Sequence, residues 1–256
     1  MTSWCLLPGL FLYFLACIFY FANTFRRTPK LEEAAHVMTV MGSVLQLAWL
    51  IYIPFVARFE NVLGLASFGV VLLFLWLLWR YRWESLGLLF MPIAFILLLL
   101  SLHPSQNLSG TFVVRLGSHP SLLMLHIAAA GLSFLFMLGN FVLGLAFVLQ
   151  ERKFRLKTWN PSSFNFPPLV SNEKRAFLWM KIGFTLLTIV LITGSMWVSQ
   201  RGITSLGEAL HVFVALIAWA IYAIVLNGRW TGFEGRRMLL LSFLGFVSLT
   251  SLFLWK

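Results

Sequence analysis

The chain alternates between long apolar stretches and short gaps that hold most of its charged residues. Hydrophobic residues make up 60% of the 256 positions and charged residues 11%, which is more apolar surface than a water-soluble core can bury. A transmembrane helix needs about 20 apolar residues, and these stretches have that length. They predict about eight spans, at approximately residues 5–24, 34–57, 61–79, 85–103, 121–149, 176–199, 206–227 and 238–255.

Helices are the expected element because a helix satisfies its own backbone hydrogen bonds inside lipid. The predicted fold class is therefore an all-α, polytopic transmembrane helix bundle, with a single integral membrane domain over residues 1–256. The longest gap, at about 150–175, is too short for a soluble domain and is interpreted as a tether or docking strip.

Lysine and arginine lie mainly in alternate gaps. One set of gaps holds Arg26, Arg27, Lys30, Arg80, Arg82, Arg152, Lys153, Arg155, Lys157, Lys174, Arg175, Arg229, Arg236 and Arg237. The other set holds Arg58, Arg115, Arg201 and Lys256. The positive-inside rule predicts that the first set is cytoplasmic and that both termini are extracytoplasmic. The cations behind the net charge of +11 flank the apolar spans, where they are expected to attract anionic membrane lipid. Nucleic acid is therefore not an expected partner.

The sequence offers little support for catalysis. It has no aspartate and none of the motifs GxGxxG, P-loop, HExxH, CxxC or CxxCH. Glutamates lie mostly in gaps, where charges are usually solvated, and no pair of buried carboxylates at helical spacing is apparent. The chain is therefore not expected to be an enzyme.

Two histidines are the main candidates for binding a cofactor. His126 and His211 lie about five and six residues into spans that both run from outside to inside, so each is about 8–9 Å below the outer surface. Imidazoles at matched depth on separate helices can ligate one haem iron from both faces. An unpaired imidazole in lipid is costly, which favours a partner. The expected cofactor is a non-covalent, b-type haem with His126 and His211 as axial ligands.

Two further residues lie near the outer end of the sixth span. Trp197 is a candidate flat wall beside the haem, while Arg201, together with Arg115, is a candidate partner for the propionates. Alternatives remain open at this point. The imidazoles can bond neighbouring carbonyls, Trp197 can be an interfacial belt residue, and the two arginines can be solvated.

The remaining polar candidates have weaker patterns. Glu208 has the spacing of a capping box at the start of the seventh span, or it accepts a hydrogen bond from His211. His36 lies near the inner end of the second span and is a candidate for a separate role there. His103 and His119 each precede a proline and are expected in surface turns.

Six short stretches of the sequence together resemble a known protein family. They are residues 57–61, 91–95, 125–128, 182–184, 194–197 and 218–222. In order, and over about residues 36–250, they resemble the cytochrome c assembly superfamily of CcsA/CcmC-type membrane proteins that handle haem. The resemblance implies a break of the fourth span at Pro92. It also implies that His126, in Leu-His-Ile-Ala, is an external axial haem ligand, because the family has Leu-His-Val-Ser there.

The chain departs from this family in its signature region. The interval from Trp197 to Trp219 has no further tryptophan and no aspartate, where the family has a tryptophan-rich run. His211 falls about where the family motif has a lysine, and Asn227 replaces a cytoplasmic-side histidine. The chain is therefore most similar to the short YpjD-like and HemX-like branch.

Two functions follow from this resemblance. The first is a multi-pass protein of the bacterial inner membrane that binds or positions haem near the outer leaflet and serves cytochrome c assembly or tetrapyrrole metabolism. The alternative is a haem-free, degenerate scaffold or accessory subunit that docks a partner protein or membrane complex. The expected partners are membrane lipid and a haem-handling, cytochrome or tetrapyrrole-synthesis protein. A third class, a small-solute transporter, also remains open, although the sequence shows no buried acids and no visible paired half-repeats with broken helices.

Overall fold

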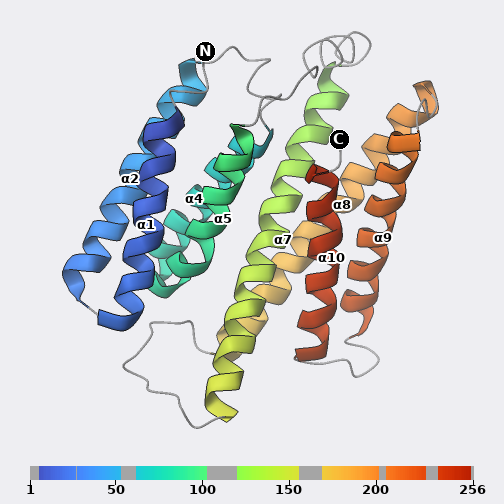
Figure 1. The fold of residues 1–256 in the computed structure, drawn as a ribbon. Coiled ribbons are helices and arrows are strands. Elements are labelled where there is room, and N and C mark those ends of the chain that lie inside the picture. Colours follow the sequence, from blue (N-terminus) through green and yellow to red (C-terminus); the bar gives the residue numbers. More distant parts are fainter. Residues whose placement is uncertain are drawn as a thin grey trace. The chain divides into compact units, whose positions relative to one another are not determined.

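The computed structural model describes residues 6–26, 28–52, 62–102, 120–155, 169–201, 206–228 and 236–254. Nearly all of this part of the chain is helical (Figure 1). The elements are α1 Leu7–Arg26, α2 Pro29–Tyr52, α4 Val62–Tyr81, η2 Glu84–Leu86, α5 Gly87–Ser101, α7 Pro120–Arg155, α8 Leu169–Arg201, α9 Leu206–Gly228 and α10 Arg236–Leu254. These α-helices follow the order of the predicted spans, and the predicted all-α membrane bundle is confirmed.

Helix lengths fit a membrane protein. Seven of the described helices are long and apolar enough to cross a bilayer, and α10 adds a shorter apolar stretch, Leu239–Ser251. The 36-residue α7 is about 54 Å long, against about 30 Å for the hydrocarbon core. Because α7 continues to Arg155 and α8 begins at Leu169, both ends of the gap predicted at 150–175 are helical, and residues 156–168 lie outside the described part.

Pro92 does not break the fourth span, contrary to the expectation from the sequence. It lies inside α5, which continues to Ser101. A proline lacks only its own N–H, so near the start of a helix it removes one backbone hydrogen bond and the rest of the helix still forms.

The helices group into two compact units, which are described separately. Unit 1 contains α1, α2, α4, η2 and α5, and unit 2 contains α7 to α10. In unit 1, α1 packs along α2 and α5, and α4 packs against α5 and α2. In unit 2, α7 packs against α8 and α10, and α9 also packs against both, so the four helices form a ring of neighbours. The single domain over residues 1–256 stays a prediction.

A buried polar bridge fixes three helices of unit 1. The Tyr13 hydroxyl donates to Gln46 Oε1 at 2.7 Å, and Gln46 Nε2 donates to the Gly64 carbonyl at 3.0 Å. Gly42 lies against the same tyrosine, since a Cβ there would come within 2.6 Å of the ring. The bridge therefore sets how α1, α2 and α4 are rotated toward one another.

Candidate functional site

A row of polar contacts joins α7 to α8. Asn140 Nδ2 donates to the Ala176 carbonyl at 2.9 Å, and the Ser133 hydroxyl donates to the Gly183 carbonyl at 2.9 Å. A buried polar group that loses its partner costs about 1–3 kcal/mol. These contacts therefore fix the register of the two helices and the face that α7 turns toward α8.

His126 continues this row by two helical turns. His126, Ser133 and Asn140 are spaced seven residues apart, so they share one face of α7. The Nδ1 atom of His126 lies 2.9 Å from Thr193 Oγ1 on α8. The next residue, Gly194, also adjoins the ring, because a Cβ there would lie 3.3 Å from His126 Cε1. The half-buried imidazole is thus held against α8.

The surroundings of Thr193 favour one tautomer of His126. The Thr193 hydroxyl has two backbone carbonyls as acceptors for its single proton, at 2.9 Å from Ile189 O and 3.1 Å from Val190 O. A hydroxyl that donates to one of these carbonyls can accept from the His126 Nδ1–H. In the tautomer with the proton on Nδ1, the Nε2 atom keeps its lone pair and is available as a metal ligand.

His211 has the same helical register on α9 as two buried residues. Ala218 and Val225 follow it at intervals of seven residues, and both are buried. His211 itself is exposed, in the second turn of the helix. It exerts an electrostatic effect on His126, at one end of unit 2. We call this end the His126 end.

A tryptophan fixes α9 against α8. Trp219 Nε1 donates to Thr188 Oγ1 at 3.0 Å, and its ring stacks on Phe184 with centroids 5.5 Å apart. These contacts lie about two turns from His211 along α9, and they set the rotation of α9 against α8.

Other predicted site residues are only partly described. Trp197 and Arg201 belong to the last turns of α8, and of these two residues the structure describes the backbone alone. Arg115, His103 and His119 lie outside the described residues. The roles predicted for all five residues therefore stay predictions.

Two further candidates, His36 and Glu208, keep open roles. His36 belongs to unit 1, where its ring lies 5.8 Å from that of Tyr20, while the His126 end belongs to unit 2. Glu208 is half-buried in the first turn of α9, three residues before His211. Both readings of Glu208, as a cap and as a partner of His211, stay predictions.

Sequence reasoning missed Thr193 as a functional residue. The available signal was a hydroxyl side chain in the middle of an apolar span, where a polar group needs a partner. Its partner became evident only from the packing of α8 on α7.

Comparisons with known proteins place the chain in a family. The sequence profile described as "Cytochrome C assembly protein" matches residues 34–254, a range that includes His126, Thr193 and His211. The inner membrane protein YpjD of Escherichia coli K12 is 28% identical over 167 residues, which cover 64% of this chain and 61% of YpjD. The matched part is thus less than two thirds of the length of YpjD.

Two longer alignments agree with this assignment. Protein HemX of Brevibacillus brevis is 26% identical over 239 residues, covering 86% of this chain and 83% of HemX. The cytochrome c biogenesis protein CcsA of Guillardia theta is 25% identical over 215 residues, covering 77% of this chain and 70% of CcsA. No solved structure matches the chain significantly. The chain belongs to the cytochrome c assembly protein family.

Proposed function

We propose that this protein binds haem at the His126 end of unit 2, with His126 and His211 as axial ligands of the iron. The observation that carries the proposal is the contact of His126 Nδ1 with Thr193 Oγ1 at 2.9 Å, which leaves Nε2 free to ligate when Nδ1 carries the proton. Histidines that ligate metals usually donate their other ring N–H to a fixed acceptor in this way. His211, which interacts electrostatically with His126, supplies the second imidazole.

The residues present suit haem better than a free metal ion. Within the described ranges, no three or more His, Cys, Asp or Glu side chains are grouped for a metal ion. Haem brings the other iron ligands in its own ring, so two axial imidazoles are enough. Thr193, Trp197 and Arg201 are spaced four residues apart on α8 and share a face. This register supports Trp197 as a wall for the ring and Arg201 as a partner for the propionates.

The proposed role is to hold haem, without covalent attachment, near the outer leaflet of a bacterial inner membrane. Bound haem would supply the iron chemistry, while the protein binds and orients the group. The printed names of the relatives, which include a cytochrome c biogenesis protein, support a role in cytochrome c assembly or tetrapyrrole metabolism. No catalytic step is assigned to the chain itself.

A second candidate is a haem-free scaffold that docks a partner protein. It is favoured by the end of α7, which carries an exposed Arg155 paired with Glu151 at 2.7 Å, in a helix longer than the membrane core. Such a helix end offers charged groups to a cytoplasmic partner. The missing tryptophan-rich run of the family also favours this alternative.

A hemin titration of the purified full-length protein separates the two functions. We expect the wild type to show low-spin absorption bands that are lost or shifted in H126A and in H211A. The variant H36A removes a histidine from unit 1 and should behave like the wild type. A wild type that binds no hemin, or H126A and H211A variants that bind it unchanged, would exclude the proposed site and leave the scaffold.

A further inference from the structure

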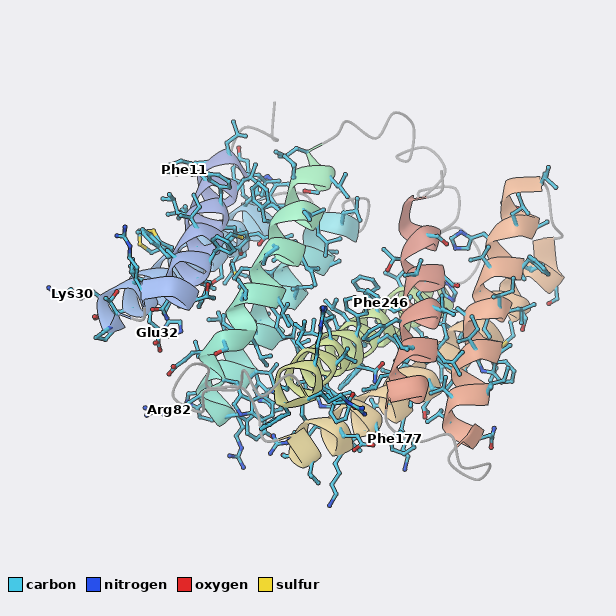
Figure 2. All side chains as sticks on the ribbon, turned by 60° about the horizontal axis from the view of Figure 1, so that its bottom comes forward. Phe11, Lys30, Glu32, Arg82, Phe177 and Phe246 are labelled. Atoms are coloured by element: carbon cyan, nitrogen blue, oxygen red, sulfur yellow. The ribbon has the colours of Figure 1, made fainter. Side chains whose placement is uncertain are left out.

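The turn between α4 and η2 brings two arginines to one end of a membrane span in unit 1. The apolar span of α4 covers Leu63–Tyr81, so Arg80 lies in its last turn and Arg82 directly after it. Both side chains are exposed, and neither makes a hydrogen bond or an ion pair within the described part of the chain. Figure 2 shows Arg82 at the end of unit 1. We call residues 80–83 the α4 corner, and none of them belongs to the proposed haem site.

The backbone of Arg82 has a conformation that arginine seldom adopts. Its φ angle is 53°, and no other residue except glycine has a positive φ in the described ranges. The Arg82 N–H donates to the Leu78 carbonyl at 2.8 Å, which is the bond of an αL cap at the end of a helix. Glycine usually occupies this position, because a Cβ strains the left-handed conformation. The arginine side chain is therefore expected to serve a role other than folding.

A stack of aromatic rings holds Arg80 in position. The Trp83 side chain is buried, and the Tyr81 ring stacks on it with centroids 4.6 Å apart. The Arg80 guanidinium lies over the Tyr81 ring, 5.2 Å from its centroid. A guanidinium placed on a ring face still directs its N–H groups outward from its edge. Arg80 is thus ordered before an anion binds, which lowers the entropic cost of binding.

An exposed apolar face of α4 leads to these arginines. Leu72, Trp76 and Arg80 are spaced four residues apart, so they lie one above another on one side of the helix. Leu72 is 48% exposed and Trp76 is 45% exposed, and Trp79, three residues further on the same side, is 79% exposed. The Trp76 ring also contacts the Tyr81 ring edge-on, with centroids 5.9 Å apart. A ligand that lies along this face meets apolar side chains and then two positive charges.

This combination matches the chemistry of an anionic phospholipid. Arginine binds phosphate oxygens through paired N–H groups and keeps its charge at physiological pH. An acyl chain provides the apolar partner that a soluble phosphate lacks, and a zwitterionic headgroup carries an ammonium group that two arginines repel. We infer that the α4 corner binds one anionic phospholipid, with the phosphate between Arg80 and Arg82 and an acyl chain along Leu72 and Trp76.

The test is native mass spectrometry of the delipidated full-length protein, titrated with phosphatidylglycerol and separately with phosphatidylcholine. We expect the wild type to bind phosphatidylglycerol at least about fivefold more tightly, because one arginine near anionic lipid contributes about that factor. R80Q and R82G should each weaken the binding of phosphatidylglycerol about fivefold. Glycerol phosphate, which carries the phosphate without acyl chains, should not displace the lipid.

The variant R82G also separates lipid binding from folding. Glycine adopts a positive φ without strain, so R82G should unfold at the same temperature as the wild type or at a higher one, while it binds the lipid less tightly. R82K keeps the charge but loses the paired N–H groups, so its affinity should lie between those of the wild type and R82G. An unfolding midpoint of R82G below that of the wild type would show that the arginine serves the fold, and would overturn the inference.

Arg26 provides a matched control. It is an exposed arginine in the last turn of α1, in the same unit, so R26Q removes one charge and leaves the α4 corner intact. R26Q should bind phosphatidylglycerol like the wild type. A wild type without preference for phosphatidylglycerol, an unchanged affinity in R80Q and R82G, or an equal loss in R26Q overturns the inference. Displacement of the lipid by glycerol phosphate would indicate a site for a soluble anion, and overturns the lipid assignment as well.

Discussion

Thr193 Oγ1 lies 2.9 Å from His126 Nδ1, and in this contact between α8 and α7 the hydroxyl oxygen can accept the Nδ1 proton. The threonine proton has other acceptors in the carbonyls of Ile189 and Val190, which favours the imidazole as the donor in this contact. Nε2 of His126 would then be free to ligate the proposed haem iron.

Replacing Thr193 tests this role. In T193V the side chain keeps its shape but loses the acceptor, so the orientation and tautomer of His126 are no longer fixed. We expect hemin affinity to fall by about 10–100-fold, the usual effect of removing a partner of a ligating histidine. T193S retains the hydroxyl and should stay near the wild type. Hemin titrations that do not distinguish T193V from T193S would contradict this account.

Replacing Gly139 with a larger residue should destabilise the contact of α7 with α8. A Cβ at this position would lie 1.8 Å from the ring of Trp179, which is itself buried. We expect G139A to cost about 1–3 kcal/mol of stability through overpacking. Gly131 on the same helix is exposed and faces open space, so G131A should be neutral or stabilising by up to about 1 kcal/mol. Thermal unfolding in detergent measures both, and equal midpoints would count against the described packing.

Removing Gln46 should lower the free energy of unfolding of unit 1, because it leaves a second buried polar group without a partner. Q46A removes the acceptor of the fully buried Tyr13 hydroxyl, at a cost of about 1–3 kcal/mol for that orphaned group. Adding Y13F removes the orphan, so the double variant should lose less than the sum of the single ones. A double-mutant cycle measured by thermal or denaturant unfolding checks this, and strict additivity would argue against the bridge.

Trp219 should matter through its N–H as well as through its ring. W219F keeps an aromatic ring against Phe184 but loses the hydrogen bond to Thr188. We expect a modest loss of about 0.5–1.5 kcal/mol. W219L also loses the stacking and should fall further. If the two variants have the same unfolding midpoint, the stacked contact does not hold α9 in place.

The fold was largely predictable from the sequence because lipid allows few structures. An apolar stretch of about 20 residues in a bilayer has to form a helix, so the existence and order of the helices followed from hydropathy. The ends of α7 and α8 did not follow from hydropathy. These helices continue past the apolar stretches, to Arg155 in α7 and from Leu169 in α8, and such extensions depend on local helix propensity, which hydropathy does not record.

The candidate site was predictable only in part. Counting residues from the predicted membrane surface gave the matched positions of His126 and His211, and their joint role as ligands stays a prediction. The contact of His126 with Thr193 depends on how α8 is rotated on α7, which the buried contacts of Ser133 and Asn140 determine. These pairings involve residues 36 to 67 positions apart, and a single sequence contains no signal for them.

The spin state of ferric haem bound to the full-length protein tests the central claim most directly. Two imidazole ligands give a low-spin signal in electron paramagnetic resonance. We predict a low-spin signal for the wild type, a high-spin signal for H126A and for H211A, and recovery of the low-spin signal when free imidazole is added to either variant. A low-spin signal that persists in H126A or H211A without added imidazole would show that the missing histidine is not a ligand.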